Sequence, residues 1–136
     1  MEHTTVENKK HRVSITHMNN AHSEWLRALS FYKDEFKILQ ERLTEIAGKN
    51  TDAAVMKEVD HFENQFAIQA ENINKLSHEI KANVSAAAEE SHASSAGYID
   101  GVLLTQHNEL QSKFDIEEKI IKDLRQSFNR FASEWM

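Results

Sequence analysis

The chain has 136 residues, of which 40% are apolar and 28% charged. These values are ordinary for one folded domain with a sizeable core, and they make disorder improbable except at the ends. The net charge of −6, with basic residues interleaved among acidic ones, disfavours nucleic acid, which is bound by clustered basic surfaces. The lack of cysteine excludes disulfides and thiolate zinc sites. No apolar run has the length of a membrane span, and the first residues lack a secretion-signal core. We therefore expect a cytoplasmic protein without membrane or nucleic-acid partners.

The scarcity of helix breakers decides the expected fold class. The chain contains no proline and only three glycines, so very long helices are possible and a turn-rich β fold is improbable. Apolar residues recur at alternating steps of three and four through most of the sequence, which is typical of helices packed along one another. The sequence predicts an all-α, up-down-up antiparallel three-helix bundle with long helices that self-associates.

The N-terminal part divides into a leader and a first helix. We expect residues 1–18 to form an extended leader, because apolar and polar residues alternate near its end. The bundle then occupies residues 19–136, and its first helix covers about 20–47, where the seven-residue pattern starts at Trp25. Gly48 is expected to take the left-handed conformation that follows many helix ends.

Two further helices complete the predicted bundle. The second covers about 52–92, and the stretch Asn50-Thr51-Asp52 is expected to supply its cap. The second reversal is placed in the small-residue stretch 85–101, with Ser95 or Asp100 capping the third helix, which covers about 100–134.

Four polar residues fall at core positions of this pattern: Gln69, Asn83, His107 and Glu117. Buried polar groups destabilise a fold unless they are hydrogen-bonded, and one such group in a helical seam often fixes the packing register. We expect Gln69 to form a hydrogen bond with Tyr32. If enclosed, Glu117 would have a raised pKa; the preferred alternative is that it leans to the surface and meets Lys113 or Lys75.

Metal binding is a second hypothesis, because the chain carries 8 histidines and 22 acidic residues. The strings Glu58-Val-Asp-His61 and Glu89-Glu-Ser-His92 match the Glu-x-x-His pattern of di-iron bundles, but the first flanks the seam and the second lies in the small-residue reversal. His22 and His107 are better candidates, since both face the core about one layer apart. Transition metals usually need three or four protein ligands, so hydrogen bonds to the backbone or to Asn83 are the favoured alternative. No cofactor is expected.

No pattern in the sequence indicates catalysis. The sequence holds no glycine-rich phosphate loop, nucleophile elbow or H-E-x-x-H string, and a seam filled with Phe and Leu leaves little room for a cavity. We do not expect an enzyme.

A second set of apolar residues falls at a heptad position that is normally polar and exposed: Phe31, Ile38, Ile68 and Ile116. One interpretation is that they fill grooves between the helices, as on an ordinary globular helix. The other is that they are exposed and bind a partner, most simply another copy of the chain. On the second interpretation, replacing Phe31 and Ile38 by Glu should give a helical monomer.

The expected function is therefore non-enzymatic: a helical bundle that acts through protein–protein interaction as a homo-oligomer with an unknown protein partner. The alternative is a bundle that binds a metal or small ligand through His22, His107 and Glu117. A chaperone-like role for the helix ends is a third, weaker possibility.

Overall fold

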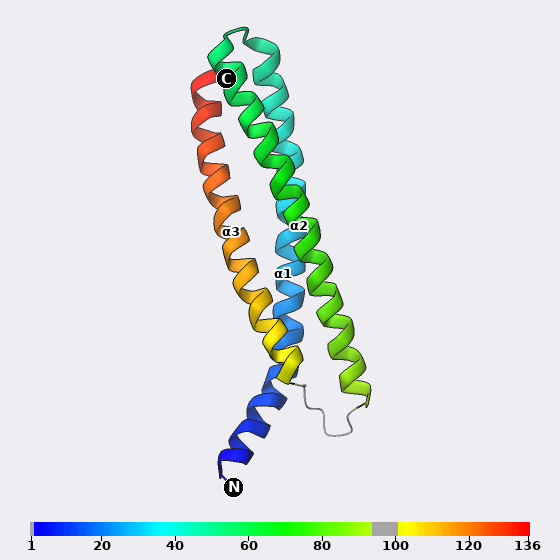
Figure 1. The fold of residues 1–136 in the computed structure, drawn as a ribbon. Helices are drawn as coiled ribbons and strands as arrows, with labels where there is room; N and C mark the ends of the chain where they lie inside the picture. Colours follow the sequence, from blue (N-terminus) through cyan, green and yellow to red (C-terminus); the bar gives the residue numbers. More distant parts are fainter. Residues whose placement is uncertain (1, 94–100) are drawn as a thin grey trace. The chain divides into compact units, whose positions relative to one another are not determined.

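The computed structural model describes residues 2–93 and 101–136, and describes side-chain surroundings for residues 16–89 and 101–136. Three helices account for nearly all of these residues: α1 (Glu2–Lys49), α2 (Ala53–Ala93) and α3 (Gly101–Trp135) (Figure 1). The described ranges contain no strand. The predicted fold class, an all-α three-helix bundle, is confirmed.

The chain divides into two compact units. Unit 1 comprises Met1–Ala28 and Leu76–Phe114, and unit 2 comprises Leu29–Lys75 and Asp115–Met136. Each unit contains a segment of all three helices, so each has its own interior and is described separately below.

In unit 2 the pairing of residues gives the helix directions. Tyr32 and Glu35 of α1 contact residues 118 and 125 of α3, so α1 and α3 run in the same direction. Phe62 and Phe66 of α2 contact Phe128, while Gln69 faces Glu117, so α2 runs the opposite way. The same up-down-up order holds in unit 1, where His22 and Trp25 meet residues 107 and 114, while Asn83 and Glu79 meet residues 106 and 113.

The interior of unit 2 contains a chain of ring contacts that links five phenylalanines: Phe36, Phe62, Phe66, Phe128 and Phe131. Phe36, Phe66 and Phe128 expose 2% or less of their surface. Burying one such ring is worth about 1.5–3 kcal/mol, so these residues hold the three helix segments of unit 2 together.

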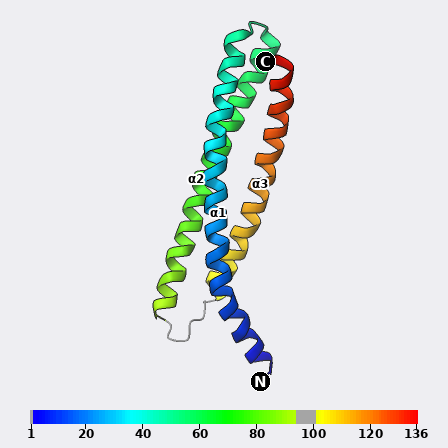
Figure 2. The ribbon, with the colours of Figure 1, turned by 180° about the vertical axis from the view of Figure 1, so that it is seen from behind.

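The connection between α1 and α2 is short and held by side-chain caps. Asp52 Oδ1 accepts a hydrogen bond from the Ala54 backbone N–H at 2.8 Å, as a helix N-cap does. At the end of α1 the Asn50 side chain donates to the Ile46 carbonyl at 2.8 Å and to the Trp135 carbonyl at 3.5 Å. The C-terminus therefore lies beside this connection, as Figures 1 and 2 show.

Two local expectations were wrong. Residues 2–18 belong to α1 and do not form an extended leader. They contain no proline or glycine, and an existing helix gains one hydrogen bond with each residue added to it. Gly48 lies inside α1 without the left-handed conformation, because the Asn50 side chain supplies the hydrogen bond that such a conformation would otherwise provide. The expected caps Ser95 and Asp100 lie outside the described residues.

Candidate functional site

The four apolar residues of the second set are exposed. Phe31, Ile38, Ile68 and Ile116 expose 60%, 55%, 47% and 61% of their surface. All four belong to unit 2. They do not fill grooves between helices, and they fall on two separate surfaces.

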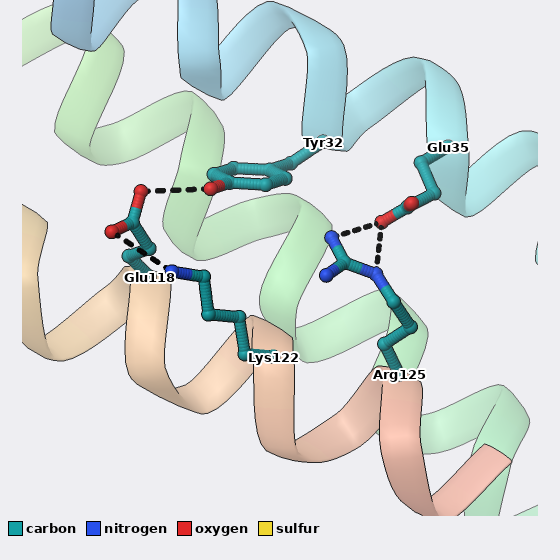
Figure 3. Close-up of polar contacts among 5 residues, drawn as sticks. All are labelled: Tyr32, Glu35, Glu118, Lys122 and Arg125. Carbon is teal, nitrogen blue, oxygen red and sulfur yellow. Dashed lines mark hydrogen bonds and ion pairs between the residues drawn. The ribbon is translucent and has the colours of Figure 1, made fainter. Parts of the chain in front are cut away.

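The first surface, called here the α1 surface, consists of Phe31 and Ile38. Glu35 lies four residues after Phe31 and three before Ile38, so the three share one face of α1. Glu35 Oε1 accepts hydrogen bonds from Arg125 Nε at 2.9 Å and Nη2 at 2.6 Å (Figure 3). The α1 surface therefore flanks the contact between α1 and α3.

A second polar network lies beside that ion pair. The Tyr32 hydroxyl donates to Glu118 Oε2 at 2.7 Å, and Lys122 Nζ lies 3.4 Å from Glu118 Oε1, as Figure 3 shows. The Arg125 guanidinium lies 5.8 Å from the centre of the Tyr32 ring, within the range of a cation–π contact. Burial, and then the Glu118 carboxylate, raise the pKa of Tyr32 to about 12. These contacts fasten α3 to α1 and leave Phe31 and Ile38 outside.

The second surface borders the groove between α2 and α3 and is called here the α3 surface: Ile68, Ile116 and Ile120. The groove contains a hollow of about 870 Å³ whose lining includes His61 of α2 and Ser127 and Arg130 of α3. Ile68 lies seven residues from His61, Ile120 seven from Ser127, and Ile116 fourteen from Arg130. Seven-residue steps keep nearly the same face of a helix, so the three isoleucines border the continuation of this groove.

Ile120 was not among the predicted interaction residues. It exposes 38% of its surface, whereas Ile121 beside it is fully buried. The sequence did indicate an exposed isoleucine at this point. Ile120 and Ile121 are adjacent, and only one of two adjacent helical residues can face the core.

All four predicted core polar residues, and His22, lie in the interior. Gln69, Asn83, His107 and Glu117 expose 4–6% of their surface, and His22 exposes 2%. They form two separate groups, a pair in unit 2 and a cluster in unit 1.

The pair in unit 2 is Gln69 with Glu117. With its nitrogen turned toward the carboxyl group, the Gln69 amide donates to Glu117 Oε1 at 2.5 Å and Oε2 at 3.1 Å. Burial raises the pKa of Glu117, and the protonated acid can instead donate to the amide oxygen of Gln69. The expected surface position of Glu117 is thus wrong, and so is the expected hydrogen bond of Gln69 with Tyr32, whose hydroxyl donates to Glu118.

The cluster in unit 1 is built on two imidazoles. His107 Nδ1 lies 3.2 Å from His22 Nε2, and the Trp25 ring stacks on His107 with ring centres 4.9 Å apart. Asn83 donates to Gln106 at 3.4 Å. Asn83 Oδ1 and His22 Nδ1 are buried and form no hydrogen bond of good geometry, but the Asn83 side chain interacts with His22 and raises its pKa against the larger effect of burial. Burial lowers the pKa of both histidines, that of His107 to about 4.

The three residues of the alternative metal hypothesis do not converge. His107 and Glu117 lie ten residues apart on α3, which is about 15 Å along a helix. Within residues 16–89 and 101–136, no three His, Cys, Asp or Glu side chains are grouped as metal ligands would be. His22 and His107 remain together as a pair.

Comparisons with known proteins show no relative. No protein-family model matches the sequence, and neither a curated protein nor a solved structure matches the chain. In the part of the chain that the structure describes, no helix is both long and apolar enough to cross a membrane.

Proposed function

We propose that this protein is a non-enzymatic, cytoplasmic helical bundle that acts by protein–protein interaction, as a homo-oligomer, through its exposed apolar residues. The observation that supports this is the exposure of Phe31, Ile38, Ile68 and Ile116, each by 47–61%. The core of the bundle is already filled, so these large apolar side chains stay in water unless a partner covers them. Covering them lowers the free energy of association. Burial of each is worth about 1.5–3 kcal/mol.

The polar contacts around the α1 surface also support a docking role. The two networks between α1 and α3 fix the backbone that carries Phe31 and Ile38. Binding of a partner then restricts little backbone freedom, and this lowers the entropic cost of association.

Sedimentation of the untagged protein at micromolar concentration tests the proposal. We expect a mass above that of one chain. Two variants, Phe31→Glu/Ile38→Glu and Ile68→Glu/Ile116→Glu, then identify the surface used, because a carboxylate in place of a buried apolar side chain opposes association. Circular dichroism should show unchanged helicity in both. A monomeric wild-type protein would refute self-association.

The His22–His107 pair supports a second candidate function, the binding of a metal ion. Their nitrogens lie 3.2 Å apart, close to the separation of about 3.3 Å between two nitrogens on a tetrahedral zinc with Zn–N bonds of about 2.05 Å. Elemental analysis of untagged protein, repeated on His107→Ala, tests it. Stoichiometric metal that is lost in the variant would support this function, and metal-free wild-type protein would refute it.

A further inference from the structure

One exposed strip of α3 has an internal symmetry. Lys113, Ile116, Ile120 and Asp123 are separated by three, four and three residues, which keeps all four on one face of the helix. The spacing is the same from either end, with two isoleucines in the middle and opposite charges at the ends. Such a strip is complementary to an antiparallel copy of itself.

All four side chains are accessible. Ile116 and Ile120 expose 61% and 38% of their surface, Asp123 is exposed, and the side chain of Lys113 is 57% exposed. Lys113 Nζ already lies 3.0 Å from Glu79 Oε2. An ammonium group has three donors, so Lys113 can bind a second carboxylate without giving up the first.

We propose that a second copy of this chain packs on this strip, with the two α3 helices antiparallel about a two-fold axis between Ile116 and Ile120. The proposal depends on the self-association proposed above and specifies its surface and geometry. Ile116 then faces the partner's Ile120, and Lys113 faces the partner's Asp123. In an isologous contact each pairing occurs twice.

The charges select this arrangement over two others. A parallel packing of the same strips would bring Lys113 against the partner's Lys113, and like charges in an interface oppose association. On the α1 surface, the residues midway between Phe31 and Ile38 are Asp34 and Glu35. Their carboxylates already lie beside Arg125 and Lys37, and the positions three residues outside Phe31 and Ile38 are Ala28 and Glu41. An antiparallel two-fold contact there would therefore lack a pair of opposite charges, so charge complementarity favours the α3 surface.

Charge reversal on α3 tests the geometry. Asp123→Lys places an ammonium opposite the partner's Lys113 in both symmetry-related contacts, and Lys113→Glu does the same with carboxylates. We expect each single change to raise the dissociation constant about tenfold, which corresponds to about 1.4 kcal/mol. The double variant Lys113→Glu/Asp123→Lys reverses both charges of each pair. Made together with Glu79→Gln, which removes the carboxylate beside residue 113 in the same chain, it should return the constant to within about threefold of that of Glu79→Gln alone.

Two control variants accompany these changes in analytical ultracentrifugation, and neither should affect self-association. Asp60→Lys makes the same change in net charge as Asp123→Lys, but residue 60 lies about 100° around α2 from the groove-lining His61. Phe31→Glu/Ile38→Glu alters the α1 surface. By contrast, Ile116→Glu/Ile120→Glu alters the proposed contact itself and should abolish self-association. Circular dichroism checks that every variant keeps its helix content.

The results separate the two proposals. A monomeric wild-type protein would overturn both. A wild-type oligomer that survives all changes on α3 but is lost in Phe31→Glu/Ile38→Glu would overturn the α3 geometry and leave the proposed function standing. Single variants that weaken association without recovery in the double variant would also overturn the geometry, because Lys113 and Asp123 would not then face each other.

Discussion

Single residues in the two interiors respond to acid in opposite ways. In unit 2 the buried Glu117 lies beside the Gln69 amide, and burial favours its neutral form. In unit 1 the buried His22 and His107 also favour the neutral form, but for an imidazole that is the deprotonated one. The same desolvation therefore raises the proton affinity of Glu117 in unit 2 and lowers that of His22 and His107 in unit 1.

Glu117 should make unit 2 less stable as the pH rises. Its native pKa lies above the ordinary value of 4.5, so its stabilising contribution is complete below that value and is lost as the pH rises through the native pKa. We expect Glu117→Gln to raise the free energy of unfolding at pH 8 by about 1–3 kcal/mol and to change it little at pH 4. Urea unfolding at both pH values measures this, with the exposed Glu63→Gln as control. A gain of equal size at both values would contradict the explanation.

His107 should have the opposite effect in unit 1. Because its pKa falls from 6.5 to about 4 on folding, the unfolded chain binds more protons between these values, and stability is lost as the pH falls through that interval. We expect His107→Gln to reduce the loss of stability between pH 7 and pH 4.5. Fluorescence of Trp25, which stacks on His107, reports unfolding in a Trp135→Phe background. As a control, His78→Gln at an exposed position should lose as much stability between pH 7 and pH 4.5 as the wild-type protein.

At the scale of helices, the caps decide where α1 stops and α2 starts. No proline separates the two helices, and Gly48 is absorbed into α1. The side chains of Asn50 and Asp52 instead satisfy backbone groups at the two helix ends. The reversal is therefore encoded in two polar side chains on either side of Thr51.

Removal of the α2 cap should be measurable. Asp52→Ala leaves the Ala54 N–H without its acceptor, and we expect the free energy of unfolding to fall by about 1 kcal/mol. Asp52→Ser should retain most of the stability because serine is also a good N-cap. Thr51→Ala, which changes an adjacent exposed residue, is the matched control in urea unfolding. Equal losses in all three variants would argue against a capping role.

At the scale of the whole molecule, the two units differ in what fills them. Unit 2 contains the five-phenylalanine cluster, whereas unit 1 contains His22, His107 and Asn83, with two buried polar atoms that form no hydrogen bond of good geometry. Buried polar groups with weak hydrogen bonds lower local stability. Each unit should therefore open with its own free energy.

Hydrogen exchange as a function of pH should separate the units. Between pH 6.5 and 4.5 we expect amides of residues 101–113 to lose protection, after correction for intrinsic exchange rates, because the histidine pair takes up protons there on opening. Amides of residues 117–131 should keep their protection, because Glu117 is buried most favourably in its protonated form and acid therefore does not destabilise unit 2. Parallel loss of protection in both segments would show a single cooperative unit instead.

The sequence alone was sufficient for the fold class. The alternating three- and four-residue spacing and the lack of proline predicted three long helices, because an apolar stripe on a helix must be buried whatever it packs against. The same pattern placed Gln69, Asn83, His22, His107 and Glu117 on the inner faces. Spacing could not give the length of α1, since a helix with no breaker can extend beyond the apolar pattern that predicts it.

Only the tertiary structure decided which side chains meet and which are left uncovered. Whether Phe31, Ile38, Ile68 and Ile116 fill grooves depends on how closely neighbouring helices approach, and this distance is set by the core residues rather than by these four. The division into α1 and α3 surfaces, the Gln69–Glu117 pair and the His22–His107 contact likewise depend on the stagger between helices. A heptad pattern specifies the face of each residue, but the stagger comes from the packing of all three helices at once.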